Sequence, residues 1–520
     1  MDQAAAINTT ASKQNITINA PIHSSPTRRT RTLKKSTKKS DNININTPKE
    51  WEFPKSKVTK NKTSKDGKSA KSPKAKHGKS SKKKKDIWNT PTRAPASPSY
   101  LKPTSTSTPT ITTTAFWSQL GNTIRGEAPD DEAGRSISLS SDGTIVAIGA
   151  PYNENSGSGY YKRGHVRIYK WDAIQSSWIQ LGNDLDGEGA GDLFGESVAL
   201  SSDGMMVAVG APEHDDDRGH VRIYKWDADQ SLWSQLGNNI NGENTGDLSG
   251  QSVALSSDGM IIAIGAPDND GNKGHVRIYK WDTDQAAWSQ LGDDIDGEAF
   301  NDLSGLPVSL SFNGRIVAIG ATSNDGNEFN SDRGHVRVYE WDEDLSTWSQ
   351  LGQDIDGEAA DNYSGWSVAM SSDGTIVAIG APYNGNGYYR GHVRIYKWED
   401  DISKWSQLGD DIDGEASCDF AGKSVSLSSD GTTVAIGAPF NDSNGFRSGQ
   451  VRVYKWDEGL STWSRHGNGG TISNGEASFH QFGYSVALSS DGMALAIGAP
   501  FNSGFGNDSS GYVKVYSLNE

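Results

Sequence analysis

The sequence predicts an all-β protein, a seven-bladed β-propeller of four-stranded antiparallel blades, preceded by a disordered basic N-terminal tail. Three observations support this fold class. A phrase of the type Gly-x-Ser-Val-Ala-Leu-Ser-Ser-Asp-Gly recurs seven times, the Val-Ala-Ile-Gly-type segments after it lie 55 to 61 residues apart, and no segment has the apolar spacing of a helix. These segments begin at Val146, Val207, Ile262, Val317, Val377, Val434 and Leu495.

Each repeat is expected to form four short strands. The first strand, as at 195–201, ends in Asp-Gly or Asn-Gly, which tolerate the positive φ angles of a tight hairpin. The second, as at 144–150, is apolar on both faces, as expected between neighbouring sheets. The third, as at 165–171, is rich in β-branched and aromatic residues, and Trp-Ser-Gln-Leu-Gly follows as the fourth. An open solenoid of the same units is the competing architecture.

The two ends of the repeat array favour a closed ring. The last repeat stops after its third strand, whereas an unpaired copy of the fourth strand, 117–121, precedes the first repeat. We therefore expect one propeller domain over residues 116–520, in which residues 116–126 supply the outer strand of the last blade. Closing the ring in this way leaves no end blade to be capped.

The N-terminal part has the opposite charge to the rest of the chain. Residues 1–115 contain 25 Lys and Arg against 6 Asp and Glu, a net charge of +19, whereas residues 116–520 contain 25 against 59, a net charge of −34. The segment 1–115 is rich in Lys, Ser and Thr and has too little apolar surface to offset chain entropy, so it is predicted to be disordered. Its lysine runs predict binding to an anionic polymer or nucleic acid by counterion release, and a solvated tether is the alternative.

Several classes of protein are excluded by composition. No run of 18 apolar residues exists, so no transmembrane segment is predicted, and no secretory signal is visible at the N-terminus. Cys418 is the only cysteine, which excludes an intramolecular disulfide and a cysteine-based zinc site. We expect a monomer.

Short motifs in the repeats carry a family resemblance. Phe194-Gly195 and Phe482-Gly483 precede first strands, and Gly-Ala-Pro closes the second strand in six repeats, with Gly-Ala-Thr at 320–322 in the other. Residues 116–520 thus resemble the FG-GAP repeats of the integrin α-subunit N-terminal β-propeller. The resemblance implies an extracellular or cell-surface module for binding or adhesion, whereas the lack of a visible signal leaves a nuclear or cytoplasmic location as the alternative. Within residues 116–520, the glycosylation sequons at Asn362, Asn441 and Asn507 would serve only a secreted chain.

The sequence predicts no metal site and no cofactor. Integrin-type blades often hold calcium in a loop before Gly-Ala-Pro, but here an apolar residue and a serine replace two of its acidic ligands, as in 139–151. A second motif, Asp-x-Asp-Gly-Glu, resembles half an EF-hand loop, with glycine where the first ligand belongs. Calcium binding and a purely structural turn both stay open for this motif, which begins at Asp184, Asp294, Asp354 and Asp411.

Residues present in every repeat are interpreted as scaffold. A glutamate before each first strand and an arginine or lysine in each third strand predict a ring of bidentate ion pairs that ties the blades together. Histidines that open five third strands are too far apart round a ring to share one metal and are assigned to packing: His165, His220, His275, His335 and His392.

A binding site must therefore come from what differs between blades. The loops between the second and third strands of blades five, six, seven and one carry aromatic residues, whereas those of blades two to four are acidic or Asn-rich. Exposed aromatics commonly anchor interfaces or stack on sugars, and packing onto their own loop is the alternative. The predicted binding residues are Tyr152, Tyr160, Tyr161, Tyr383, Tyr388, Tyr389, Phe440, Phe446, Phe501 and Phe505.

The function predicted from the sequence is that of a non-enzymatic binding, adhesion or scaffold module. The loop face would bind a protein or glycan, and the basic tail an anionic partner. No nucleophile elbow, phosphate-binding glycine loop or compact catalytic set is visible, so no catalytic residue is predicted. The alternatives are a lectin-like carbohydrate-binding protein and an enzyme that acts on a glycan or phosphoester.

Overall fold

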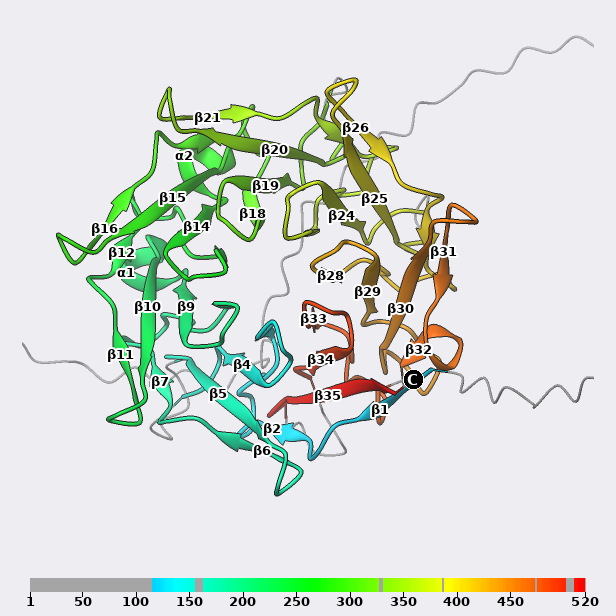
Figure 1. Cartoon of the computed structure of the whole chain (residues 1–520), viewed down its shortest axis with the longest axis horizontal. Helices are drawn as coiled ribbons and strands as arrows, with labels where there is room; N and C mark the ends of the chain where they lie inside the picture. The colour runs from blue at the N-terminus through cyan, green and yellow to red at the C-terminus, as the bar shows by residue number, and fades with distance from the viewer. Residues whose placement is uncertain are drawn as a thin grey trace, which may run out of the picture. The chain divides into compact units, whose positions relative to one another are not determined.

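The structure is a computed structural model that describes residues 115–154, 162–326, 331–385, 388–472, 475–501 and 509–519. These residues form seven antiparallel β-sheets around a central axis (Figure 1). The seven-bladed propeller predicted from the repeat period is confirmed. Apart from Ala115, the predicted basic tail lies outside the described residues.

The first strand of each blade lies nearest the axis (Figure 1). Each inner strand ends where Asp-Gly or Asn-Gly turns the chain back, with glycine at positive φ, as at Gly143 (φ 71°). A β-bulge between Ser304 and Val308 lengthens the strand of blade four. The seven inner strands are β3 (Ser136–Leu139), β8 (Ser197–Leu200), β13 (Ser252–Leu255), β18 (Ser304–Leu310), β23 (Ser367–Met370), β28 (Ser424–Leu427) and β33 (Ser485–Leu488).

The second strands are almost wholly buried, because both of their faces pack against neighbouring blades. In blade one, for example, Val146 and Ile148 lie in one core cluster with Val513 and Val515 of blade seven. The second strands are β4 (Ile145–Ala150), β9 (Met206–Ala211), β14 (Ile261–Ala266), β19 (Ile316–Ala321), β24 (Ile376–Ala381), β29 (Thr433–Ala438) and β34 (Ala494–Ala499).

The third strands are the longest and pair on both sides. On the inner side Ala147 of β4 faces Ile168, and on the outer side Trp171 faces Trp178. The third strands are β5 (His165–Asp172), β10 (His220–Asp227), β15 (His275–Asp282), β20 (His335–Asp342), β25 (His392–Glu399), β30 (Gln450–Asp457) and β35 (Tyr512–Asn519).

The outer strand of each blade is divided into two pieces that both pair with the third strand, whereas the sequence predicted one strand. A glycine at positive φ, such as Gly182 (φ 80°), follows the first piece and bends the chain. The longer pieces are β1 (Phe116–Gln119), β6 (Ser177–Gln180), β11 (Leu232–Gln235), β16 (Ala287–Gln290), β21 (Thr347–Gln350), β26 (Lys404–Gln407) and β31 (Thr462–Arg465). The shorter pieces are β2 (Ile124–Arg125), β7 (Leu185–Asp186), β12 (Ile240–Asn241), β17 (Ile295–Asp296), β22 (Ile355–Asp356), β27 (Ile412–Asp413) and β32 (Thr471–Ile472).

The N-terminal and C-terminal strands of the propeller meet in blade seven. Strand β1 pairs antiparallel with β35, Phe116 facing Asn519, and β2 continues the pairing at Ile124 and Val513 (Figure 1). The indole Nε1 of Trp117 donates to the backbone oxygen of His466 over 3.1 Å, as the equivalent Trp178 donates to Leu120 over 2.9 Å. The first strand of the described chain therefore completes its last blade.

A belt of backbone hydrogen bonds also surrounds the axis at the end where first and second strands are joined. Each bond runs from one blade to the next, and the seventh returns to the first blade, so the belt closes only for a complete ring. The N–H to O bonds are Ser141–Ser202, Ser202–Ser257, Ser257–Phe312, Phe312–Ser372, Ser372–Ser429, Ser429–Ser490 and Ser490–Ser141, each 2.8 or 2.9 Å long.

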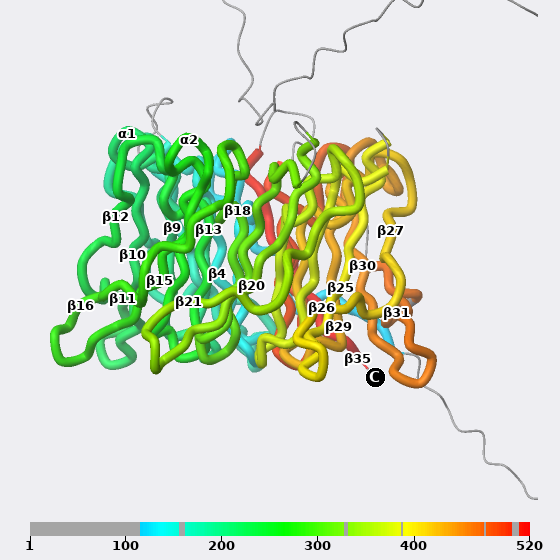
Figure 2. The backbone as a smooth tube through the Cα atoms, turned by 90° about the horizontal axis from the view of Figure 1, so that it is seen from above, coloured from blue at the N-terminus to red at the C-terminus, as the bar shows by residue number. Residues whose placement is uncertain are grey.

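The two ends of the propeller differ in their connections. We call "hairpin end" the end with the hairpins between first and second and between third and fourth strands, and "loop end" the end with the remaining loops (Figure 2). The loop end carries two four-residue turns labelled α1 (His214–Asp217) and α2 (Asn269–Asn272), which include left-handed residues. One 3-10 turn, η1 (Asn468–Gly470), precedes β32. Among the described residues, no helix has the length and hydrophobicity needed to span a membrane.

Candidate binding site at the loop end

The aromatic residues of blades five and six form one cluster across the boundary between these blades. The ring of Tyr383, from the loop after β24, lies 5.2 Å from the ring of Phe420, at the entry to β28. Phe420 lies 4.8 Å from Phe440 and 5.4 Å from Tyr389. Tyr363, at the entry to β23, lies 4.9 Å from Tyr383. Four loops thus contribute rings to one cluster.

Backbone hydrogen bonds between the loops explain why rings from different blades meet. The N–H of Phe420 donates to the carbonyl of Tyr389 over 3.1 Å. One blade further on, the N–H of Phe479 donates to the carbonyl of Phe446 over 2.8 Å, and the two rings lie 5.3 Å apart. Each loop between second and third strands is therefore fastened to the entry segment of the next blade.

Part of this cluster is open to solvent. The most exposed rings are Tyr388 (67%), Phe446 (54%), Phe479 (47%) and Tyr389 (39%). The Arg447 guanidinium carbon lies 4.9 Å from the half-buried Phe440 ring and 5.3 Å from the exposed Phe446 ring, and so links the two rings. We call the following set the aromatic sector: Tyr363, Trp366, Tyr383, Tyr388, Tyr389, Phe420, Phe440, Phe446 and Phe479.

The remaining predicted site residues lie on blades seven and one. Phe501 packs against Tyr484, with ring centroids 5.7 Å apart. The Tyr152 ring lies 3.8 Å from Nζ of Lys162 and 5.2 Å from the guanidinium carbon of Arg135, and its burial raises the pKa of its hydroxyl. The other three predicted residues, Tyr160, Tyr161 and Phe505, lie outside the described residues.

Sequence reasoning missed a second set of residues, at position x of the Gly-x-Ser motif. These side chains surround the axis at the start of the inner strands, and five consecutive blades form an unbroken series of contacts. Lys423 Nζ lies 4.0 Å from the Trp366 ring and 5.6 Å from the Tyr484 ring, and Arg135 lies 5.6 Å from Tyr484. The available signal was that x differs in all seven repeats, whereas the other positions of the motif are nearly constant. The seven residues are Arg135, Glu196, Gln251, Leu306, Trp366, Lys423 and Tyr484.

Arg135 ends this series in a partly buried ion-pair network. Its Nε donates to both carboxylate oxygens of Glu196, at 3.0 and 2.8 Å, and its Nη1 donates to Glu132 over 3.0 Å. Burial raises the pKa of Glu132 to about 6, although the charge of Arg135 opposes this shift. The network therefore places a carboxyl group with a raised pKa beside Arg135, whose guanidinium lies near the Tyr152 and Tyr484 rings.

The predicted ring of ion pairs between blades is confirmed, but its bidentate geometry was wrong. In four of the pairs, those of Arg167, Arg222, Arg277 and Arg337, Nη1 contacts the carboxylate while Nη2 donates to a backbone carbonyl of the preceding blade, as from Arg222 to Asp186 over 2.7 Å. Because this carbonyl accepts from the second terminal nitrogen of the guanidinium, that nitrogen is not available to the glutamate. The nitrogen–oxygen distances are 3.3 Å for Arg167–Glu127, 3.7 Å for Arg222–Glu188, 3.6 Å for Arg277–Glu243, 3.7 Å for Arg337–Glu298, 3.8 Å for Arg452–Glu415 and 2.6 Å for Lys514–Glu476, and Arg394 also contacts Glu358.

The Asp-x-Asp-Gly-Glu motifs have protein partners at each of their acidic positions. Asp184 accepts a hydrogen bond from Gln180 over 2.6 Å, and Asp294 accepts one from Gln290 over 2.7 Å. At Asp186, Asp296 and Asp413 the second aspartate supplies the backbone carbonyl that the next blade's arginine contacts, and the glutamate supplies the ion pair described above. These contacts support the structural alternative for the motif.

The turn that corresponds to the integrin calcium loop is closed by protein hydrogen bonds. Asp142 accepts from the Ser140 hydroxyl over 2.7 Å and from the Thr144 N–H over 3.0 Å, and Ser140 in turn accepts from Ile145 N. Partial burial opposes ionisation, but these bonds lower the pKa of Asp142. The carboxylate therefore serves the hairpin turn itself.

Two of the predicted glycosylation sequons are inaccessible in the folded propeller. Asn362 and Asn441 are both buried. The Asn441 amide donates to the buried Asp419 carboxylate over 3.1 Å, a bond that a glycan on the same nitrogen would break. The third sequon, at Asn507, lies outside the described residues.

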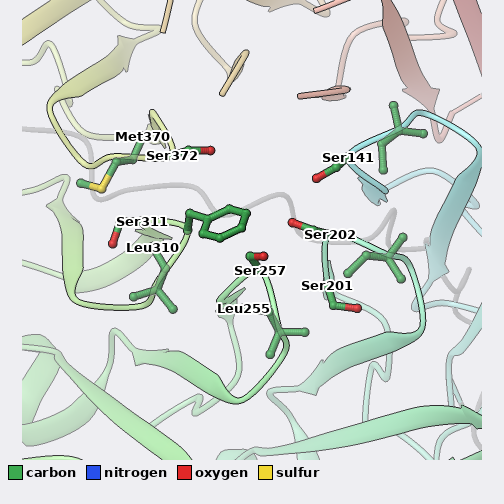
Figure 3. Close-up of a pocket in the computed structure, with 12 residues that line it drawn as sticks. Ser141, Ser201, Ser202, Leu255, Ser257, Leu310, Ser311, Met370 and Ser372 are labelled. Carbon is green, nitrogen blue, oxygen red and sulfur yellow. The ribbon is translucent and has the colours of Figure 1, made fainter. Parts of the chain in front are cut away.

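A small cavity lies on the axis at the hairpin end. Its volume is about 150 Å³, and its lining combines leucines and Met370 with the serines of the backbone belt. Figure 3 shows the hydroxyl groups of Ser141, Ser202 and Ser257 directed toward the opening. Blade four departs from this pattern because the exposed Phe312 occupies the place that serine occupies in the other six blades.

Comparison with known proteins identifies the repeat. Residues 185–224, which span strands β7 to β10, match the family model described as the FG-GAP repeat. A search of curated proteins returned no match.

Among solved structures, similarity is found to a putative 6-phosphogluconolactonase from Bacteroides uniformis (13% identity, 66% of this chain, 86% of that chain, TM-score 0.47). It is also found to a periplasmic gluconolactonase from Pseudomonas aeruginosa (16%, 66%, 85%, TM-score 0.44) and to U3-55K (14%, 76%, 98%, TM-score 0.46). At these values the similarities carry no argument about function. The FG-GAP repeat that the Phe-Gly and Gly-Ala-Pro segments predicted is confirmed by the match at residues 185–224.

Proposed function

We propose that the chain is a non-enzymatic binding module that holds a protein or glycan ligand at the loop end of blades five, six, seven and one. The observation that supports this proposal is the aromatic sector, in which rings pack against one another across blade boundaries. The rings of Tyr388, Tyr389, Phe446 and Phe479 are exposed. Large apolar rings that stay in water are unfavourable unless a ligand covers them, and aromatic and arginine side chains dominate binding energy at interfaces.

The charged residues beside the aromatic sector support binding over catalysis. Arg135 is held by Glu132 and Glu196, and Lys423 lies over the faces of Trp366 and Tyr484. Such groups orient a ligand and exclude wrong partners through charge complementarity. We also propose that the basic segment 1–115 adds a contact to anionic polymers or nucleic acid, which would respond strongly to salt.

Loss of the three most exposed rings of the aromatic sector should abolish ligand binding without unfolding the protein. Ligands are first selected for the full-length chain from a phage-displayed random-peptide library and from an immobilised glycan panel, at high salt to screen the basic segment. The triple variant Tyr388→Ser, Phe446→Ser, Phe479→Ser is expected to bind the selected ligands more than about 10,000-fold more weakly, since three interface aromatics at about 2 kcal/mol each contribute about 6 kcal/mol together.

The matched control is Phe300→Ser, which removes an exposed loop-end ring at the entry to blade four, outside the aromatic sector. This variant should bind as the unmodified chain does, and both variants should keep its melting temperature. Equal affinity of the triple variant and the unmodified chain would reject the proposed site.

A carbohydrate ligand at the hairpin end is the second candidate. Serine hydroxyls around an opening can donate to and accept from sugar hydroxyls, and an exposed phenyl ring can cover the apolar face of a pyranose. The cavity of about 150 Å³ with Phe312 beside its serines combines both features.

Replacement of Phe312 by the serine of the other blades should weaken such a site. If sugar binds there, saturation-transfer NMR with glucose, galactose, mannose and N-acetylglucosamine should detect binding that falls roughly 10-fold in Phe312→Ser, the scale of one aromatic contact. Phe300→Ser again serves as the control. Undiminished saturation transfer in Phe312→Ser would exclude the hairpin end as the sugar site.

A further inference from the structure

The boundary between blades one and two brings two histidines and a carboxylate together. His220 opens β10, His214 lies in the loop between β9 and β10, and Glu188 follows β7 of blade one. One ligand atom from each of the three residues lies within 4.8 Å of the other two. The two imidazole rings have centroids 4.1 Å apart.

His220 is fully buried and has no hydrogen-bond partner for either ring nitrogen among the described residues. Buried polar atoms are almost always paired, because a buried group without a partner loses the hydrogen bonds that water gave it. A neutral imidazole keeps a lone pair on one ring nitrogen, and that nitrogen can bind a metal ion.

This boundary differs from the equivalent boundaries in its ligand types. At four other boundaries one histidine lies together with two carboxylates. Here Asn239 stands where the others have the second carboxylate, and His214 is the third potential ligand instead. His214 is also unusual at its position, the second residue after Gly-Ala-Pro, because the six other repeats have asparagine there. The four other groups are Glu127–His165–Asp184, Glu243–His275–Asp294, Glu298–His335–Asp354 and Glu358–His392–Asp411.

The asparagines at the equivalent position show what His214 replaces. Asn153 donates to the buried Asp131 over 3.1 Å, and Asn324 donates to Asp302 over 3.0 Å. In blade two Nδ1 of His214 lies 3.2 Å from Oδ1 of the corresponding Asp192. A carboxylate in contact with an imidazole fixes the orientation of the ring, as carboxylates commonly do for histidines that bind metals.

Two imidazoles and one carboxylate are a ligand set typical of zinc, with a fourth position left for water. Glu188 and Asp192 together carry two negative charges, against the single positive charge of Arg222, whose Nη1 lies 3.7 Å from Glu188. The local balance therefore favours a cation. We propose that Glu188, His214 and His220 form a binding site for one zinc ion between blades one and two.

A bound ion would connect the two blades, since Glu188 belongs to the end of blade one and both histidines to blade two. The ion would thus add to the ion pairs that tie every blade to the next. This site differs from the calcium motifs considered in the sequence, because it uses nitrogen ligands and only one boundary has two histidines among the described residues.

The test uses the untagged full-length chain, freed of metal by a chelator. Titration with zinc chloride in a calorimeter should show one saturable site per chain, and zinc should raise the melting temperature. Titration with cobalt chloride should give the visible absorption bands of a tetrahedral cobalt ion, a readout of the ligand geometry itself. Absence of a saturable zinc site would overturn the proposal.

His214→Asn is the decisive variant, because asparagine occurs at this place in the other blades and should fold normally. It should weaken zinc binding by at least about 10-fold and remove the cobalt bands. Glu188→Gln should do the same. The control is His275→Gln, which alters the equivalent histidine of blade three and copies Gln450 of blade six. Unchanged zinc affinity in His214→Asn, or an equal loss in His275→Gln, would reject the assignment.

Discussion

Deletion of residues 116–125 should unfold the propeller or leave it strongly destabilised. The deletion removes β1 and β2 and with them the buried side chains of Trp117 and Ile124 from blade seven. Each lost core side chain costs about 3 kcal/mol or more, and the whole domain is stable by only about 5–15 kcal/mol. Strand β35 would also become an exposed edge with unpaired backbone groups. Thermal and urea unfolding followed by circular dichroism would measure the effect.

A circular permutant provides the matched rescue. Asn519 faces Phe116 in the same way that Asp227 faces Leu232 across a hairpin of blade two. Moving residues 116–125 behind Asn519, in place of Glu520 and joined by a copy of 228–231, would convert blade seven into an ordinary blade. This permutant should recover most of the lost stability. If the deletion left the unfolding midpoint unchanged, the pairing of β1 with β35 would have no role in closing the ring.

Replacement of Gly265 by alanine should produce the second largest loss of stability. This glycine belongs to the Gly-Ala-Pro segment of blade three, and a Cβ atom there would lie 1.9 Å from the backbone oxygen of Gly305 in blade four. Neither the added Cβ nor the backbone oxygen of Gly305 can move away by a change of side-chain rotamer, so the two blades would have to move apart. We expect a destabilisation of about 3 kcal/mol or more, at the upper end for an overpacked core site.

Gly459→Ala is the control for this experiment. Gly459 lies in the hairpin after β30, and an added Cβ would approach only the flexible carboxylate of Asp457, at 3.3 Å. Urea denaturation should show little change for this variant. A similar midpoint for Gly265→Ala and the unmodified chain would mean that the close approach of neighbouring blades does not limit this position.

Much of the fold could be predicted from the sequence because the same local signals recur in every repeat. Asp-Gly pairs mark the hairpins, alternating and continuous apolar segments mark the strands, and the leftover copy at 117–121 indicates where the ring closes. The division of each outer strand was missed, since the residue type of a glycine such as Gly182 does not show that its φ is positive, and this φ separates the two pieces.

The candidate sites were less predictable because they combine residues from different repeats. Variation between the loops after the second strands indicated Tyr383 and Phe440, but not Phe420 and Phe479. These two residues lie in entry segments, which backbone hydrogen bonds and ring contacts join to the loops of the preceding blade. His214 could have been found as the one departure from asparagine at its position.

By itself, the sequence determined the number of blades, the order of strands within each blade and the Glu–Arg pairs between blades, because each of these follows from a pattern repeated seven times. Only the tertiary structure decided which variable side chains touch, such as Lys423 with Trp366 and Tyr484, or His214 with His220. The physical reason is that ring closure places residues about one repeat apart side by side at the axis and at the blade boundaries. Whether two such side chains meet depends on the path of the loops and on the space between the packed blades. The sequence of a single repeat determines neither of these.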